Sequence, residues 1–165
     1  MGGEGATAHD ENCEVLALVM KVSAKGRYGL VAMTHLAQNF NNGTPITIIS
    51  ISNKLGISKI YLEQVFALLK RAKLVTSVKG SQGGYQLMHK PSDITVFDIL
   101  SAIELSLMEP TISESKYPEL DKAINSCVYS PLDEKIFEFL KSITLEDILN
   151  AVHKEMDTSS LMYFI

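Results

Sequence analysis

The arrangement that most constrains the fold of this chain lies at residues 47–88, where two short helical patterns meet at a glycine and two β-prone runs follow. The first pattern, TIISISNKLG, begins at the favourable N-cap residue Thr47 and ends at Gly56, a residue type preferred just after a helix. The second begins at Ser58, in KIYLEQVFALLKRAK. Two helices joined by a turn of about three residues are typical of a helix-turn-helix, which places its second helix in the DNA major groove, although helical bundles contain this pattern too.

The stretch SVKGSQGGYQL at 77–87 predicts a β-hairpin directly after the second helix, because LVTSV and YQLM are β-prone and KGSQGG supplies turn residues. The glycines Gly80, Gly83 and Gly84 also indicate that the backbone approaches another surface closely. Such a hairpin is the wing of a winged helix, whose tip contacts phosphates or the minor groove, where Lys79 is favourable. A plain surface hairpin is the alternative. A phosphate-binding nucleotide loop is excluded, because Gly84 is followed by a strand and not by a helix.

Helical patterns are also predicted on both sides of this region. Residues 24–40, AKGRYGLVAMTHLAQNF, form an amphipathic helix that the turn residues NNGTP end. After the hairpin, ITVFDILSAIEL starts with a capping box formed by Thr95 and Asp98. Residues 109–127 are polar and irregular, with a short helical segment at 119–124. The predicted fold class is therefore mainly α with a small β-hairpin, a winged helix-turn-helix.

The C-terminal part predicts a long amphipathic helix that needs a surface to pack on. Ser130 and Pro131 suit its first turn, where proline is tolerated, and apolar residues recur at helical spacing as far as Ile143. This stripe either covers the core or meets its copy in a two-fold dimer. A second Thr-x-x-Asp box starts a last helix that is expected to end near Val152, with a frayed remainder.

Charge divides the chain into parts of opposite sign. Residues 20–92 carry ten Lys or Arg residues and one acid, Glu63, a net charge of +9, whereas residues 93–165 carry −9 and residues 1–19 carry −4. Lysine and arginine near phosphates release condensed counterions, so the positive segment favours a module that binds a polyanion. Solvated charge on an exposed surface is the alternative. Residues 1–19 are expected to be a disordered leader or extension.

Other functional classes find little support in the sequence. The apolar run VLALVM at 15–20 is too short to span a bilayer and follows acidic residues where a signal peptide needs positive charge, so no membrane association and a cytoplasmic location are expected. Cys13 and Cys127 are too few for a disulfide scaffold and too scattered for a zinc site. The histidines lack metal-ligand spacing, and no serine or cysteine lies beside an obvious base. We therefore expect that the protein is not an enzyme.

Three segments in this order and spacing resemble the Rrf2 family of bacterial transcription regulators: MKVSAKGRYGLVAMTHLA, ISKIYLEQVFALLKRAKLVTSVKGSQGGYQL and ITVFDILSAIE. The most specific part is YLEQ followed by a GGY wing. The resemblance implies a winged helix-turn-helix DNA-binding domain at 20–104, then an irregular loop and dimerisation helices at 105–165, with the long C-terminal helix forming a homodimer. The expected function is repression of transcription on double-stranded DNA, tuned by a partner protein or a small effector. A winged-helix module that binds protein instead of DNA is the alternative.

By position, the resemblance places DNA-reading residues at the start of the second helix and phosphate contacts at the start of the first. Gln64 can pair with adenine through two hydrogen bonds, whereas Glu63 either accepts from cytosine or rejects sites without that donor. Tyr61 either contacts the DNA backbone or covers the core. Lys79 stands where many relatives carry arginine, so a point charge replaces a bidentate contact. The candidate DNA-binding residues are Lys25, Arg27, Tyr28, Ser58, Lys59, Tyr61, Glu63, Gln64, Lys79, Gly80, Ser81, Gln82, Gly83, Gly84 and Tyr85.

The chain departs from cluster-binding members of the family between residues 109 and 130. Those members place three cysteines in this loop, whereas here Cys127 stands alone, with Ser115, Asp121 and Ser130 near the other ligand positions. An iron–sulfur cluster takes about four ligands, so we expect no cofactor and no metal site. Cys127 is then either an oxidation sensor or a buried, unreactive thiol, and the lack of a basic neighbour favours the second.

Overall fold

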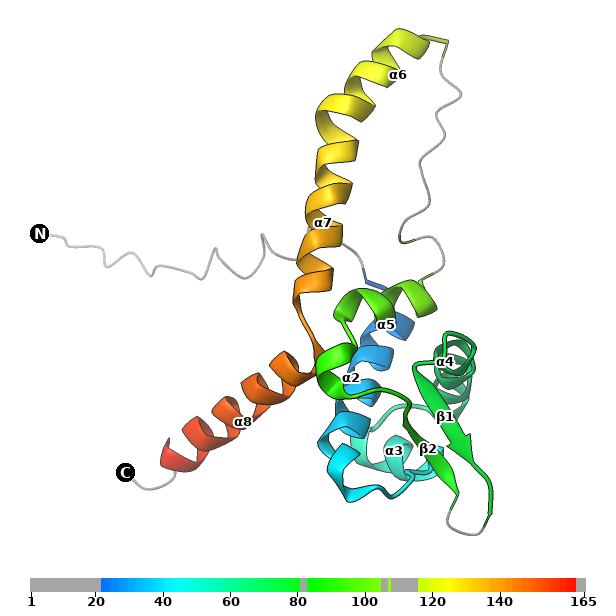
Figure 1. The fold of residues 1–165 in the computed structure, drawn as a ribbon, viewed down its shortest axis with the longest axis vertical. Coiled ribbons are helices and arrows are strands. Elements are labelled where there is room, and N and C mark those ends of the chain that lie inside the picture. The colour runs from blue at the N-terminus through cyan, green and yellow to red at the C-terminus, as the bar shows by residue number, and fades with distance from the viewer. Residues whose placement is uncertain (1–21, 81–82, 105–106, 108–115, 163–165) are drawn as a thin grey trace, which may run out of the picture.

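The computed structural model of the protein describes residues 22–80, 83–104, 107 and 116–162, so the leader predicted at 1–19 lies outside the described residues. A compact body carries a two-stranded hairpin on one side, and two long helices leave it in different directions (Figure 1). The mainly α fold with a small hairpin is confirmed. The body contains α2 (Ala24–Gln38), α3 (Ile48–Leu55), α4 (Lys59–Arg71), β1 (Val75–Val78), β2 (Gly84–Leu87) and α5 (Val96–Ile103), with short 3₁₀ turns η1 (Phe40–Asn42) and η2 (Pro91–Asp93).

The helix-turn-helix forms where the local sequence predicts it. The Thr47 hydroxyl accepts a hydrogen bond from the backbone N–H of the third residue of α3 (3.0 Å), and Gly56 ends that helix in the left-handed conformation (φ 65°). The Ser52 hydroxyl donates to the Ile57 carbonyl across the turn (2.6 Å). Ser58 occupies the N-cap position of α4 as predicted, although its side chain makes no capping hydrogen bond.

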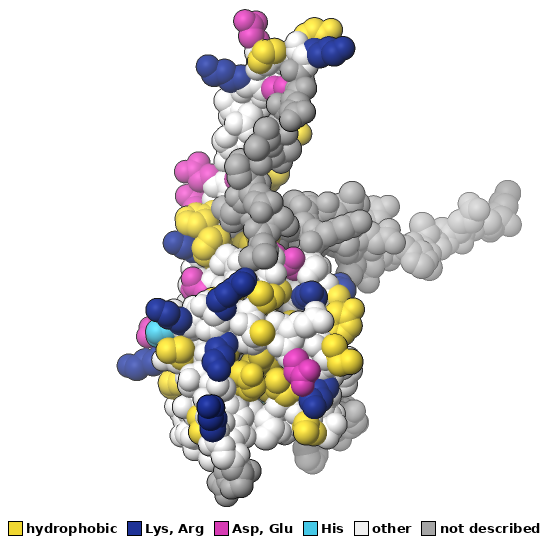
Figure 2. Space-filling view, turned by 90° about the vertical axis from the view of Figure 1, so that its right-hand side faces the viewer, with side chains coloured by type: hydrophobic (Ala, Val, Ile, Leu, Met, Phe, Trp, Pro, Cys, Tyr) yellow, Lys and Arg dark blue, Asp and Glu magenta, His cyan; other side chains and the backbone are white. Residues whose placement is uncertain are grey.

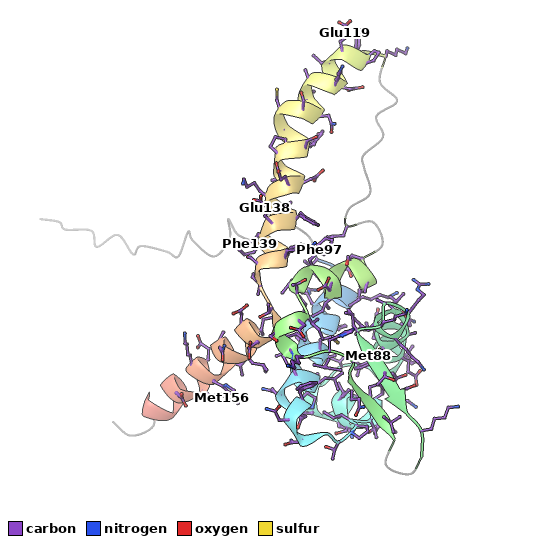
Figure 3. The ribbon with its side chains drawn as sticks, in the orientation of Figure 1. Met88, Phe97, Glu119, Glu138, Phe139 and Met156 are labelled. Carbon is purple, nitrogen blue, oxygen red and sulfur yellow. The ribbon has the colours of Figure 1, made fainter. Side chains whose placement is uncertain are left out.

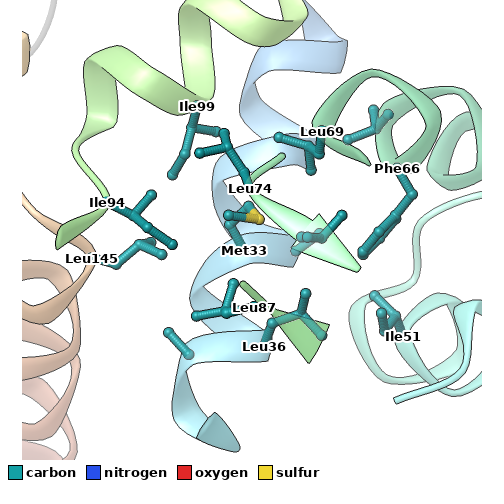
Figure 4. Packing of buried hydrophobic residues seen from close by; sticks show 14 of the residues in the cluster. Met33, Leu36, Ile51, Phe66, Leu69, Leu74, Leu87, Ile94, Ile99 and Leu145 are labelled. Atoms are coloured by element: carbon teal, nitrogen blue, oxygen red, sulfur yellow. The ribbon is translucent and has the colours of Figure 1, made fainter. Parts of the chain in front are cut away.

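The hydrophobic core lies between α2, the helix-turn-helix, the hairpin and α5 (Figure 4). Met33 of α2 is fully buried at its centre, and the hairpin contributes Val75 and Leu87. Each large apolar side chain buried in this way contributes about 1.5–3 kcal/mol of transfer free energy. The apolar stripe predicted for α4 is the face that packs on this core, and it consists of Leu62, Val65, Phe66 and Leu69.

The hairpin is attached to the body through a one-residue third strand. Tyr85 donates its backbone N–H to the Ile46 carbonyl (2.8 Å), and Ile46 donates back to Tyr85 (2.9 Å). The Tyr85 ring packs against Phe66 with centroids 4.6 Å apart. A Cβ atom at Gly84 would lie 2.6 Å from the carbonyl carbon of Ile46. The close approach that the glycine-rich stretch indicates is therefore met, at Gly84, by the protein's own backbone.

We expect Gly84→Ala to lower the free energy of unfolding by about 1–3 kcal/mol, because the new methyl group collides with backbone and not with a side chain that can rotate away. Urea unfolding followed by circular dichroism measures the change. Gln86→Ala in the same strand serves as the control, because it removes atoms without creating a clash, and we expect it to cost less than about 1 kcal/mol. Equal stability of Gly84→Ala and the unchanged protein would contradict this role.

The helix predicted to start at Ser130 starts earlier in the structure, at Pro118, and we call it the projecting helix. α6 (Pro118–Ile124), the π-turn η3 (Asn125–Tyr129) and α7 (Ser130–Ser142) follow one another without a break, so one helix runs from 118 to 142. In the π-turn the Ser130 N–H donates to the Asn125 carbonyl, one residue further back than in an α-helix. Proline inside a helix lacks an N–H and clashes with the preceding turn. The wider turn directly before Pro131 accommodates that residue, so proline does not mark the start of the helix here.

The last helix, α8 (Leu145–Met162), extends well beyond the predicted end near Val152. Its predicted start is confirmed: Thr144 and Asp147 form the reciprocal hydrogen bonds of a capping box, 2.9 and 3.1 Å long. The hydrogen bonds from the side chain and backbone of Thr144 hold the pKa of the Asp147 carboxyl below its usual value. Among the helices in the described part of the chain, we find none with the length and apolar character needed to cross a membrane.

Candidate nucleic-acid interface

The first two turns of α4 present their polar side to solvent. Lys59, Glu63 and Gln64 are exposed, whereas Leu62 on the other side of the helix is fully buried. The helix is therefore held on the core by one face and keeps the opposite face accessible. We call this accessible set the α4 face, and it consists of Ser58, Lys59, Ile60, Tyr61, Glu63 and Gln64, all of which are exposed.

Two contacts order the α4 face. The ring of Tyr61 meets that of Tyr28 edge to face, with centroids 5.8 Å apart, yet Tyr61 remains 45% exposed. Tyr61 therefore covers part of the body and is still accessible, so the two roles predicted for it are compatible. Lys59 Nζ lies 3.5 Å from Glu63 Oε1, and both side chains are about half exposed. Such a pair contributes about 0.3–0.5 kcal/mol, so a DNA phosphate can compete for the lysine at little cost.

The Tyr28–Tyr61 contact also joins the start of α2 to the start of α4. The Ser23 hydroxyl caps α2 by accepting from the Gly26 N–H (3.2 Å). Arg27, next to Tyr28 in the chain, is exposed, and Lys25 is half buried. The structure thus brings one residue that the resemblance assigned to phosphate contacts, Tyr28, against one that it assigned to the reading helix, Tyr61.

The candidate residues of the wing, unlike those of the α4 face, are not all exposed. Lys79 and Gly80 are exposed, and Gly80 has a φ of 119° that favours glycine. Gly84 and Tyr85 hold the hairpin on the body through Ile46, as described above. Gly83 is half buried, and a Cβ atom there would lie 2.5 Å from the carbonyl oxygen of Val78 inside the hairpin. The candidates Ser81 and Gln82 lie outside the described residues.

The Lys and Arg side chains of the body extend over a wider surface than the candidate DNA-binding residues do. Figure 2, which faces the side of the body that carries α4 and the hairpin, shows Lys and Arg side chains spread across it. Lys59 and Arg71 lie at opposite ends of α4, about 18 Å apart along the axis at a rise of about 1.5 Å per residue. Lys70 donates to the Ser77 hydroxyl of β1 (2.6 Å) and supports the hairpin. One groove cannot engage all of these cations, so several supply only a general positive field.

Sequence reasoning missed Ile60, whose side chain is 67% exposed on the α4 face. A signal for it was present, because Ile60 falls outside the apolar stripe of α4 and stands between Lys59 and Tyr61. An apolar side chain in the major groove can contact the methyl group of thymine. Ile60 therefore joins the residues suited to reading bases.

Cys127 lies in the π-turn of the projecting helix and is exposed, so the expectation of a buried thiol is wrong. Its Sγ atom is 3.9 Å from the Ser126 hydroxyl. Asp121 and Ser130, which stand near other predicted ligand positions, lie on the same helix, and Ser115 falls outside the described residues. Within the described ranges, no group of three or more His, Cys, Asp or Glu residues could hold a metal ion.

Comparisons with known proteins agree on one family. The Rrf2 family model, described as an iron-dependent transcriptional regulator, matches residues 22–151. The transcriptional regulator IscR of Klebsiella pneumoniae (strain 342) is 37% identical over 133 residues, which are 79% of this chain and 80% of that protein.

Solved structures of relatives share the fold. T. potens IscR superposes with a TM-score of 0.66 at 41% identity, covering 82% of this chain and 90% of that one. CymR, the global cysteine regulator of B. subtilis, gives a TM-score of 0.68 at 34% identity over 80% of this chain and 98% of that one. The chain therefore belongs to the Rrf2 family and is a winged-helix, DNA-binding transcription regulator.

Proposed function

We propose that the protein is a sequence-specific repressor that binds double-stranded DNA as a homodimer in the cytoplasm. The α4 face enters the major groove, Arg27 and Lys25 contact the flanking phosphates, and the wing tip with Lys79 contacts the backbone beyond them. The observation that carries this proposal is the accessible polar side of α4, which joins the start of α2 through the Tyr28–Tyr61 contact. Helix-turn-helix proteins read DNA with the N-terminal residues of the second helix in this orientation.

The roles on the α4 face follow from hydrogen-bonding capacity. Gln64 offers a donor and an acceptor that match the major-groove edge of adenine, and Ile60 offers an apolar surface for a thymine methyl group. Glu63 accepts from cytosine or excludes sites that lack this donor, and in the free protein it pairs weakly with Lys59.

The exposed surface of the projecting helix supports the proposal of a homodimer. Five of its exposed apolar residues recur at spacings of four and seven, so they follow one side of the helix. Contiguous exposed apolar surface on a helix that leaves the body is typical of a protein–protein interface. In Figure 3, Phe97 lies on the side of α7 that faces α5, whereas Phe139 lies on the other side. We call this set the projecting stripe, and it consists of Leu120, Ile124, Val128, Leu132 and Phe139.

The donor set of the chain does not fit an iron–sulfur cluster. Cys13 and Cys127 are its two cysteines, and such a cluster takes about four ligands. We therefore derive no step through bound iron. A partner protein or a small effector supplies the signal in this proposal, and the exposed Cys127 is available as an oxidation sensor.

Lys79→Ala is expected to weaken binding to the cognate site and to random DNA alike, and to reduce the slope of log affinity against log salt concentration by about 1, because one phosphate contact is lost. Fluorescence anisotropy over a range of salt concentrations measures both quantities. Lys122→Ala, which removes an exposed lysine from the projecting helix, is the control and should leave the slope unchanged. An unchanged slope for Lys79→Ala would place the wing away from the phosphates.

The experiment that tests the proposed function is selection of DNA by the purified protein from fragmented genomic DNA, followed by sequencing of the retained fragments. The proposal predicts enrichment of a site with two related half-sites one helical turn or a multiple of it apart, about 34 Å per turn. Retention without any enriched sequence would contradict sequence-specific binding.

A further inference from the structure

Two segments far apart in the sequence share the pattern Ile-Thr-x-x-Asp-Ile-Leu: ITVFDIL at the start of α5 and ITLEDIL at the start of α8. They also share their local structure. Thr95 N–H donates to Asp98 Oδ2 (2.9 Å), and Asp98 N–H donates to Thr95 Oγ1 (3.1 Å). Thr144 and Asp147 make the same two hydrogen bonds with the same lengths. Both helices therefore begin with an identical capping box.

The two boxes are joined by an antiparallel bridge in which their threonines face each other. Val96 N–H donates to the Ile143 carbonyl (2.8 Å), and Leu145 N–H donates to the Ile94 carbonyl (2.9 Å). Exchanging the two segments converts each hydrogen bond into the other, so the bridge has a local two-fold symmetry. Ile94 and Leu145 are fully buried beside each other at the edge of the core (Figure 4). The bridge is thus a small connection, made by two backbone hydrogen bonds, between α5 and the segment between α7 and α8.

This connection lies at the base of the projecting helix. α7 ends directly before the bridge, and its last turns pack on α5: Leu140 is buried against Val96 and Leu100. Phe137 meets Phe97 edge to face, with centroids 4.8 Å apart. Between residues 118 and 135, by contrast, the side chains of the projecting helix are largely exposed. The body therefore holds this helix at one end.

A helix held at one end acts as a lever. The helix from 118 to 142 is about 37 Å long at about 1.5 Å per residue, so a rotation of about 10° at its base moves the far end by about 6 Å. The two half-sites of a dimeric regulator lie about 34 Å apart on DNA, with base pairs about 3.4 Å apart. A small change of direction at the base would therefore shift one α4 relative to its half-site by more than one base pair.

We propose that residues 94–98 and 143–147, here named the box joint, set the direction of the projecting helix and thereby the spacing of the two copies of α4 in the dimer. This inference rests on the proposed function, because it requires a dimer that binds two half-sites. The residues of the box joint are positioning residues that act through α7. They define a property that neither the α4 face nor the projecting stripe supplies: the fit between the dimer and the half-site spacing.

The test uses one variant in two redox states. Thr95→Cys and Thr144→Cys are combined with Cys13→Ser and Cys127→Ser, so that the only thiols face each other across the bridge. Facing residues in an antiparallel pair have Cβ atoms about 4.5–5.5 Å apart, near the range in which a disulfide can form. The reduced form lacks both cap hydroxyls, whereas the oxidised form has a covalent link at the same place. The probes are a duplex selected from a random pool by the Cys13→Ser/Cys127→Ser protein, and the same duplex cut to one half-site.

We expect the reduced form to bind the two-half-site duplex at least fivefold more weakly than the oxidised form. Affinity for the single half-site and the dimer mass in sedimentation should be the same in both forms. Equal affinity for the full duplex in both forms, or an equal loss on full and half sites, would overturn the role of the joint. If the Cys13→Ser/Cys127→Ser protein selects no duplex at all, the proposed function itself fails and the joint with it.

A second variant covers the case in which the reduced form does not fold. Val96→Pro removes the hydrogen bond to the Ile143 carbonyl while leaving a residue suited to the first position of α5. Thr95 before it has the extended conformation that a residue preceding proline prefers (φ −93°, ψ 161°). If the box joint has the proposed role, Val96→Pro lowers the affinity for the two-half-site duplex and leaves the affinity for the single half-site unchanged. An equal loss of affinity for both duplexes would contradict that role.

Discussion

Ile124→Asp is expected to convert the protein to a monomer and to lower its affinity for a two-half-site operator by at least about a hundredfold. The side chain lies within the projecting stripe, between Leu120 and Val128. A carboxylate buried there without a partner costs several kcal/mol, and loss of the dimer removes the gain from linking two half-site contacts. Sedimentation measures the mass, and fluorescence anisotropy on the selected duplex measures the affinity.

Ser126→Asp is the matched control for this variant. It introduces the same charge two residues further along the same helix, on the side away from the stripe, where Ser126 is exposed. We expect this variant to remain dimeric and to bind the operator as the unchanged protein does. A dimeric Ile124→Asp, or an equal effect of the two substitutions, would show that the stripe is not the interface.

Gln64→Ala should weaken binding to the cognate operator by about tenfold or more while changing the affinity for random DNA less than about twofold. A bidentate contact to adenine is worth about 1–3 kcal/mol of discrimination, and about 1.4 kcal/mol corresponds to tenfold. The measurement is competition between the two duplexes on the same protein sample. Gln38→Ala on α2 removes an exposed glutamine away from the α4 face and should affect neither affinity. Equal losses on operator and random DNA would exclude base reading by Gln64.

The helix-turn-helix could be predicted from the sequence because its determinants are local. Thr47 caps α3, Gly56 takes the left-handed conformation, and the apolar stripe of α4 is its buried face. The same holds for the capping box at Thr95, which depends on residues within one turn of helix. At the caps and at the turn, only a few residue types satisfy the backbone group or conformation concerned, so the pattern leaves little choice.

The features that the sequence could not predict depend on contacts between distant segments or on helix geometry beyond one turn. Pro131 indicated a helix start, whereas in the structure a π-turn directly precedes it and the helix continues through it. Gly84 indicated close approach, but the partner, Ile46, belongs to a segment far away in the chain. Cys127 was expected to be buried, and its exposure follows from a helix that projects from the body. The candidate base-reading residues were found through positional resemblance, and exposure on the structure added Ile60 to them.

The decisive measurement of DNA binding by this protein is its affinity for the selected duplex at increasing salt concentration. A dimer held on DNA by the exposed start of α4, the start of α2 and the wing requires log affinity to fall linearly and steeply with log salt concentration, with a slope that reflects several phosphate contacts. It also requires tighter binding to the selected duplex than to random DNA. An affinity that does not change with salt, or that is the same for both duplexes, would contradict sequence-specific DNA binding and favour a winged helix that binds protein.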